Sequence, residues 1–168
     1  IEKNRPGARF AAGLDLGCGT GLMAEALTGR VDHFTGCDLS PEMIARAEAE
    51  RRYHALAVAD AVTYLRRCVD SFDLVTAADV LVYVGALGDL LGEVAPRLAS
   101  GGLFAFSVEE SIGDDLILRD SLRYAHSEAY VRRVAAEASL AILDLRRATL
   151  RYDRGAPIEG LVVLTAAV

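Results

Sequence analysis

The chain has 168 residues, 52% of them hydrophobic and 25% charged, which provides enough apolar material for one globular core and excludes a disordered chain. Its formal net charge of −6 argues against a nucleic-acid partner, because proteins that bind duplexes present a strongly basic face. The longest apolar runs, such as residues 161–164, are far too short to span a bilayer, so we expect no membrane partner.

Short apolar runs alternate with segments of helical periodicity up to residue 108. The apolar runs predict strands at residues 12–16, 33–37, 55–59, 72–77 and 103–108. The segments between them predict helices at about 20–27, from Ser40 onward, at 61–68 and at 87–94. Ser40, Pro41 and Glu42 are typical of a helix start, because serine caps exposed N–H groups and proline and glutamate suit the first turn.

The pattern changes in the last third of the chain. Residues 109–126 are irregular and polar, which predicts a long loop with at most one helical turn. Ser127 then caps a helix that runs to about Ala138, and strands follow at 141–152 and 158–167. The connection between these two strands is so short that they must pair antiparallel.

These elements predict one α/β domain that spans residues 1–168. We expect a Rossmann-like, doubly wound and mostly parallel sheet of about seven strands, with helices on both faces and a C-terminal antiparallel hairpin. The chain opens on Ile1 rather than on Met, so we also expect that a region upstream of it is missing.

Three cysteines, Cys18, Cys37 and Cys68, form no Cys-x-x-Cys pair. An odd number of cysteines is typical of free thiols in a reducing compartment, so we expect a cytoplasmic protein without a metal site. Each cysteine is interpreted as a small buried hydrophobe.

The strongest functional signal is a glycine-rich turn between the first strand and the first helix, with the sequence LDLGCGTG at residues 14–21. Glycines at alternate positions let the backbone adopt conformations closed to other residues and let a ligand approach the main chain. Asp38 ends the next strand about 20 residues downstream, the spacing at which a carboxylate accepts hydrogen bonds from ribose hydroxyls. The glycine-rich turn and Asp38 together indicate an adenosine-containing ligand at the carboxyl end of the sheet.

The glycine spacing separates two classes of ligand. A dinucleotide fingerprint is G-x-G-x-x-G and places a pyrophosphate over a helix N-terminus, whereas this chain has G-x-G-x-G. Asp15, two residues before the first glycine, would repel a pyrophosphate but could hold an ammonium group, directly or through water. This charge favours S-adenosylmethionine, whose amino-acid end carries an ammonium, and leaves a nicotinamide-dependent oxidoreductase as the alternative enzyme.

The chain resembles the class I S-adenosylmethionine-dependent methyltransferases, closely over residues 13–109 and more loosely over the terminal helix and hairpin. The ordered segments that carry the resemblance are LDLGCGTG, GCDLSPEMIARA, the Asp60–Ala61 pair, FDLVTAADVLVYVG and LASGGLFAFSVE. They cover residues 13–109. The segment RYAHSEAYV at 123–131 is similar to predicted methyltransferases that carry tetratricopeptide repeats upstream, which would account for a missing amino-terminal region.

The resemblance implies a set of cofactor-binding residues: Asp15, Gly17, Cys18, Gly19, Gly21, Asp38, Leu39, Asp60, Ala61, Ala77 and Asp79. Asp38 would accept from the ribose hydroxyls, and Leu39 would pack on the adenine. Asp60 would accept from the adenine amino group, with a further contact from the Ala61 backbone. A helix cap is the alternative role for Asp60.

At the methionine end of the cofactor, the resemblance implies that Asp15 steers the amino-acid moiety while Ala77 and Asp79 line it. Asp79 could equally start a helix or form an ion pair. Tyr83 could close over the cofactor, although such an aromatic is more often half-buried packing.

No residue is identified as catalytic, and the candidates are Tyr83, Glu109 and His126. Glu109, with Glu110, leaves the fifth strand at its carboxyl end and could act as a base or bind an amine. His126 follows the irregular loop, where a capping or surface role is commoner. Methyl transfer is an in-line displacement on an activated group, so positioning suffices and no base is required.

The methyl acceptor is narrowed only by exclusion. Residues 77–80 lack the Asn/Asp-Pro-Pro-aromatic motif of enzymes that methylate exocyclic amines of bases or glutamine amides. An O or N atom of a small molecule or a protein remains, with S-adenosylhomocysteine as the product. The second alternative is a non-catalytic module that binds the cofactor and serves as a partner surface.

Overall fold

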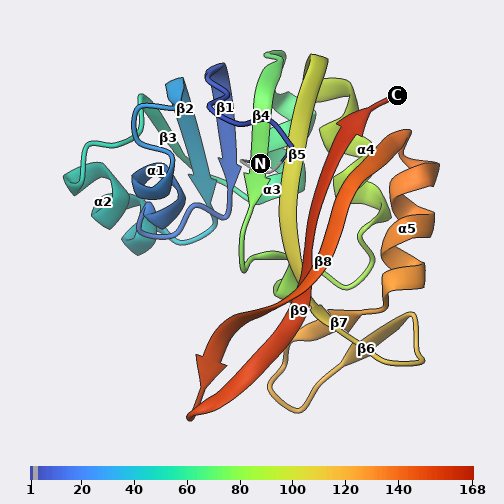
Figure 1. The fold of residues 1–168 in the computed structure, drawn as a ribbon. Helices are drawn as coiled ribbons and strands as arrows, with labels where there is room; N and C mark the ends of the chain where they lie inside the picture. The colour runs from blue at the N-terminus through green and yellow to red at the C-terminus, as the bar shows by residue number, and fades with distance from the viewer. Residues whose placement is uncertain (2–3) are drawn as a thin grey trace.

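The computed structural model describes residues 1 and 4–168 and shows a nine-stranded sheet flanked by helices (Figure 1). Five parallel strands form its first part, in the order β3-β2-β1-β4-β5. Their bounds are β1 Phe10–Leu16, β2 Val31–Asp38, β3 Ala55–Val58, β4 Phe72–Ala77 and β5 Leu98–Glu110. Each corresponds to a predicted strand. The strand order reverses between β1 and β4, the place where open α/β sheets bind ligands.

Short helices connect the strands and cover both faces of the sheet, as predicted (Figure 1). Their bounds are α1 Leu22–Ala26, α2 Pro41–Ala49, α3 Ala61–Arg67, α4 Gly88–Val94 and α5 Glu128–Glu137, with 3-10 turns η1 Leu81–Tyr83 and η2 Ala95–Arg97. Side-chain caps start α2 at Ser40, α3 at Asp60 and α5 at Ser127. None of the helices in the described residues combines the length and apolar character that a membrane crossing requires.

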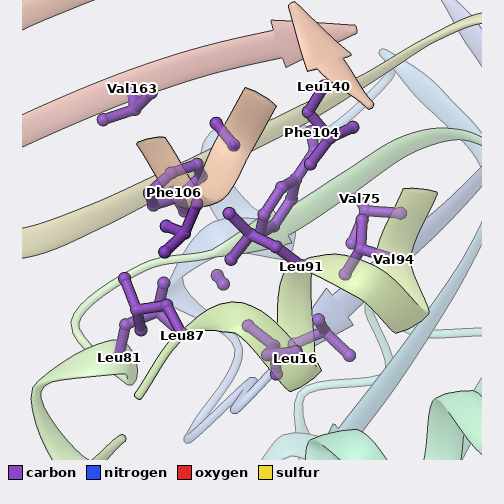
Figure 2. Packing of buried hydrophobic residues seen from close by; sticks show 14 of the residues in the cluster. Leu16, Val75, Leu81, Leu87, Leu91, Val94, Phe104, Phe106, Leu140 and Val163 are labelled. Carbon is purple, nitrogen blue, oxygen red and sulfur yellow. The ribbon is translucent and has the colours of Figure 1, made fainter. Parts of the chain in front are cut away.

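The main hydrophobic core lies between the sheet and helices α4 and α5. Figure 2 shows Leu91 and Val94 of α4, and Leu87 just before it, in the same core as Phe104 and Phe106 of β5. These three residues have the i, i+4, i+7 spacing that places side chains on one face of a helix. The core holds the carboxyl ends of β4 and β5 in place, and this edge of the sheet carries the candidate site.

The prediction of a loop over residues 109–126 is wrong. This region contains two short strands, β6 Leu116–Leu118 and β7 Tyr124–His126, which pair antiparallel with each other. β7 also pairs in parallel with the end of β5, where Glu109 faces Ala125. Strands of three residues are too short to show an alternating pattern, and they raise the strand count from the expected seven or so to nine.

The C-terminal hairpin consists of β8 Leu140–Asp153 and β9 Ala156–Ala167, and β9 pairs antiparallel with β5. The predicted pairing is confirmed, but the turn is shorter than residues 153–157. Arg154 and Gly155 have φ angles of 49° and 83°, which suits the two-residue turns that match strand twist. The hairpin runs past the carboxyl ends of the parallel strands, toward the bottom of Figure 1.

Candidate functional site

The glycine turn joins β1 to α1 at the carboxyl edge of the sheet. Gly17, Gly19 and Gly21 have φ angles of 64°, 53° and 94°, in the region that favours glycine. A Cβ added to Gly17 would lie 2.6 Å from the Cβ of Val80, whereas one added to Gly19 would meet no atom of the described chain within 4 Å. The backbone at Gly19 is therefore open to a ligand.

Cys18 lies inside this turn and ties it to the end of β2. Its backbone N–H donates to the carbonyl of Cys37 at 3.0 Å. Both thiols are free, and burial raises the pKa of each to about 12. At neutral pH both side chains are uncharged, and they pack as small apolar groups.

Asp38 ends β2 beside the turn. Its Oδ2 accepts a hydrogen bond from the N–H of Gly19 at 2.9 Å, and its Oδ1 accepts one from the N–H of Ser40 at 2.8 Å. Each oxygen of an ionised carboxylate has two lone pairs, so both atoms keep acceptor capacity for ligand hydroxyls. The structure brings Gly19 and Asp38 into direct contact, as their spacing in the sequence predicts.

Asp15 lies beneath the turn and is 2% exposed. Its Oδ2 accepts from the Tyr53 hydroxyl at 2.6 Å, and its Oδ1 accepts from Thr76 Oγ1 at 2.7 Å. Burial raises the pKa of Asp15 from 3.8 to about 6, although the two hydrogen bonds oppose the rise. The negative charge of Asp38 contributes to the same rise, so the two carboxylates are close enough to interact.

Exposed apolar side chains flank Asp38 on the side of β2 and β3. Leu39, just after β2, is 72% exposed, and Val58, the last residue of β3, is 54% exposed. Asp60 follows, and its Oδ1 accepts from the N–H of Thr63 at 2.9 Å, which caps α3. Ala61 is the first residue of that helix. The alternative role of Asp60 as a helix cap is therefore present, and it uses one of the two carboxylate oxygens.

On the other side of the turn, Ala77 is buried at the end of β4, and Asp79 follows it. Asp79 has a φ of 55°, unusual for a residue other than glycine. Its N–H donates to Ser107 Oγ at 3.0 Å, and its carboxylate pairs with Arg151 of the hairpin. The alternative of an ion pair is thus realised for Asp79. Tyr83 of η1 is largely exposed, and its hydrogen bond raises the pKa of Arg123.

The two glutamates at the end of β5 are both held by arginines. Glu109 is buried and pairs with Arg151, with the Nε of Arg119 at 3.5 Å. Glu110 receives two hydrogen bonds from Arg147, at 2.7 and 2.9 Å. Arginine side chains therefore occupy both carboxylates, and neither glutamate is free to contact an acceptor.

His126 of β7 is fully buried. Its Nε2 lies 2.7 Å from the carbonyl oxygen of Gly85, so this nitrogen carries the proton and donates. Nδ1 has no hydrogen-bond partner among the described residues. Burial lowers the pKa of His126, so the ring is neutral. Its hydrogen bond joins β7 to the loop after η1, an arrangement typical of a structural histidine.

Several side chains that hold this edge of the sheet were not among the predicted site residues, and three of them contact predicted ones directly through a side chain. Tyr53 holds Asp15, Val80 packs on Gly17, and Arg151 joins Asp79 to Glu109. Val80 lies inside a segment that carries the family resemblance, so it could have been considered. Tyr53 and Arg151 follow no motif, and their partners are distant in sequence.

The fold and the glycine turn define a Rossmann-like domain with a site suited to an adenosine-containing ligand. A family model described as a methyltransferase domain matches residues 14–106. The chain therefore belongs to this methyltransferase family.

Among curated proteins, the chain is similar to ubiquinone biosynthesis O-methyltransferases. That of Burkholderia orbicola is 32% identical over 101 residues, which are 56% of this chain and 42% of the relative. That of Xanthomonas campestris is 34% identical over 110 residues, which are 61% of this chain and 43% of the relative. The chain thus spans less than half the length of these relatives.

Solved structures show the same fold at low sequence identity. An S-adenosylmethionine-dependent methyltransferase from Clostridium acetobutylicum gives a TM-score of 0.77 at 22% identity, covering 98% of this chain and 86% of that one. Magnesium protoporphyrin IX methyltransferase from Synechocystis, solved with bound S-adenosylmethionine, gives 0.71 at 16% identity, covering 96% and 71%. These similarities establish the fold.

Proposed function

We propose that this chain binds S-adenosylmethionine at the carboxyl edge of β1 and β2 and directs its methyl group to an O or N atom of a small-molecule or protein acceptor. The observation that carries this proposal is the contact between Gly19 and Asp38. It combines open space beside the backbone of Gly19 with a carboxylate that can still accept hydrogen bonds.

The donor set fits this cofactor. Asp38 has the acceptor capacity that vicinal ribose hydroxyls need, and Leu39 and Val58 offer exposed apolar surface beside it for a base. The side chain of Asp60 follows β3 at the same edge, where it could accept from an exocyclic amino group. These features together support an adenosine moiety that lies across the ends of β2 and β3.

The negative charge of Asp15 beneath the glycine turn supports the placement of the methionine end of the cofactor there. Asp15 and Asp38 place two carboxylates close together at this edge. Such a field attracts an ammonium or sulfonium and opposes a pyrophosphate. Family membership and this field together favour the sulfonium cofactor over the nicotinamide alternative.

The chemistry that the cofactor supplies when bound is a methyl group activated by a positively charged sulfur. The chain contributes binding and orientation: the backbone at Gly19, the carboxylate of Asp38 and the Asp79–Val80 loop define where an acceptor can approach. Glu109 is paired with Arg151, and the ring of His126 is fully buried. The proposed rate enhancement therefore comes from alignment rather than from a base on either residue.

The proposed acceptor is a broad class, because the similarity to known methyltransferases lies mainly in the part of the chain that would hold the cofactor. The match to the family model ends at residue 106 of this chain, whereas β6 to β9 come after that residue. The curated relatives are named as O-methyltransferases, which supports an oxygen acceptor, but the match covers less than half of each relative. Residues 77–80 lack the Asn/Asp-Pro-Pro-aromatic motif, which argues against an exocyclic amine as the acceptor.

A titration distinguishes the cofactors directly. We expect S-adenosylhomocysteine to raise the Tm of the protein and NADH to leave it unchanged. Stabilisation by NADH alone would reverse the assignment. Release of S-adenosylhomocysteine with a panel of acceptors then separates an enzyme from a non-catalytic binding module, which would bind the cofactor without turnover on any of them.

We also propose, from the resemblance of residues 123–131, that the chain follows tetratricopeptide repeats in a longer cytoplasmic protein. The coding sequence upstream of Ile1 tests this proposal. Helical repeats of about 34 residues would support it and would favour a protein as partner or acceptor. An upstream sequence without such a period would contradict it.

A further inference from the structure

We infer that Arg151 on the hairpin is a positioning residue for the cofactor site, because it joins Asp79 to Glu109 and so fixes the loop that lies against the glycine turn. The inference rests on the proposed binding of S-adenosylmethionine at that turn. It gives the C-terminal hairpin a role in cofactor binding, although the hairpin carries none of the predicted cofactor residues.

The first observation is the pairing of Arg151 itself. Its Nη1 donates to Asp79 Oδ1 and its Nη2 donates to Glu109 Oε1, so one guanidinium bridges the ends of β4 and β5. Glu109 is 1% exposed, and a buried carboxylate is costly unless it is paired. The Arg151–Glu109 pair is therefore part of the interior, and it anchors the guanidinium that also reaches the exposed carboxylate of Asp79.

The second observation is that the hairpin is shaped to bring Arg151 to this place. The register of β8 against β9 shifts between Thr149 and Arg151, and such bulges redirect side chains. Gly160 of β9 pairs with Glu109 of β5. A Cβ on Gly160 would lie 2.8 Å from Leu150 Cγ and would also collide with the Val108 carbonyl, so glycine permits the close approach of hairpin and β5.

The third observation concerns the residue that Arg151 holds. Asp79 has a left-handed backbone, which is unfavourable for a residue other than glycine and persists where the surroundings impose it. The bonds to Ser107 and Arg151 provide that constraint. Val80 follows directly and packs on Gly17. A contact path thus runs from Arg151 through Asp79 and Val80 to the glycine turn.

A matched control lies on the same strand. Arg147 of β8 also bridges two carboxylates, Glu110 at 2.7 Å and Glu128 at 3.0 Å. Its side chain is 62% exposed, and neither partner belongs to the proposed cofactor set. Substitution of Arg147 therefore removes a comparable arginine bridge without touching the Asp79–Val80 loop.

The test measures S-adenosylhomocysteine affinity by calorimetry, together with Tm, for Arg151→Lys, Arg147→Lys and the wild type. Lysine keeps a cation beside Glu109 but lacks the planar fork that reaches two carboxylates. We expect Arg151→Lys to fold and to bind at least fivefold more weakly, while Arg147→Lys binds as the wild type does. Arg151→Gln should bind still more weakly, with a lower Tm because Glu109 loses its closest partner.

A double-mutant cycle separates positioning from a direct effect. If Arg151 acts through Asp79, Arg151→Lys should cause no further loss of affinity in an Asp79→Asn background. Unchanged affinity in Arg151→Lys, or a full additional loss in that background, would overturn the inference and leave the cofactor assignment intact. Failure of the wild type to bind S-adenosylhomocysteine would overturn both.

Discussion

The two sides of the candidate site are built from different interactions. On the side of β1 and β2, a glycine turn and a carboxylate 19 positions away meet through a backbone N–H, with Asp38 accepting from Gly19. On the side of β5 and the hairpin, side-chain ion pairs join residues 42 and 72 positions apart, from Arg151 to Glu109 and to Asp79. The first side is therefore defined by the local backbone conformation. The second side is an ion-pair clamp, that is, the Arg151 bridge between Asp79 and Glu109, and it depends on the tertiary fold.

The two sides of the site should differ in how well they tolerate substitution. A backbone contact at a glycine turn is sensitive to substitution, because a positive φ is unfavourable for residues other than glycine. An ion-pair clamp can be rebuilt with other charged residues as long as the buried Glu109 keeps a partner. We therefore expect cofactor binding to depend most on the first side and to be tuned by the second.

The largest expected effect comes from the backbone of the first side. Gly17→Ala introduces a Cβ into Val80 at a φ of 64°, so we expect unfolding to become easier by about 3 kcal/mol. Gly19→Ala has a similar φ but no neighbouring atom, so its loss of stability should be smaller, while S-adenosylhomocysteine binding still weakens. Chemical denaturation of both variants checks this ranking, and equal stabilities would show that Val80 does not pack as described.

The next largest effect should come from removal of the Asp38 carboxylate on the first side. Asp38→Ala should weaken S-adenosylmethionine binding at least tenfold, or about 1.4 kcal/mol, because the ribose hydroxyls lose their acceptor. Asp32→Ala is the matched control, since Asp32 lies on the same strand but pairs with Arg9 at the surface. Calorimetry on the two folded variants decides the point. Unchanged affinity in Asp38→Ala would remove the central residue of the site.

A smaller effect should follow from the pKa of Asp15. Its pKa is raised to about 6, so the carboxylate that favours an ammonium is lost as the pH falls through 6. We expect S-adenosylhomocysteine to bind about fourfold more weakly at pH 5.5 than at pH 7.5, from the ionised fraction alone. Asp15→Asn should bind weakly at both values, and a wild-type affinity that does not vary with pH would contradict this role.

The same pKa has the opposite consequence for stability. A carboxyl whose pKa is raised by folding stabilises the fold below its unfolded pKa, and this contribution is lost as the pH rises through about 6. At neutral pH the buried carboxylate of Asp15 is charged, which lowers the free energy of unfolding. Asp15→Asn should therefore raise the Tm of the ligand-free protein at pH 7.5 while it weakens binding.

The smallest effect on binding should come from His126. Its ring is buried and neutral and bonds to Gly85, outside the path from Arg151 to the glycine turn. His126→Gln can keep a donor to Gly85, so we expect a modest fall in Tm and an S-adenosylhomocysteine affinity within twofold of the wild type. Loss of turnover with intact affinity and Tm, on any acceptor that the panel identifies, would make His126 a catalytic candidate again.

The two sides also differ in how far the sequence predicts them. Gly17, Gly19 and Asp38 are close in sequence and obey a known spacing, so their convergence could be foreseen. Tyr53 could not be tied to Asp15, because only the tertiary fold brings a loop residue 38 positions away to that carboxylate. Strands β6 and β7 were missed since three residues give no periodicity. Arg151 belongs to no motif, and the bulge beside it leaves no signature in composition.

The most direct test is a crystal structure of the complex with S-adenosylhomocysteine. The account predicts that the ribose hydroxyls lie within hydrogen-bond distance of the Asp38 carboxylate, with the ligand over Gly19 and its adenine against Leu39. A ligand bound elsewhere on the molecule, or a carboxylate of Asp38 that contacts only the protein in the complex, would contradict it.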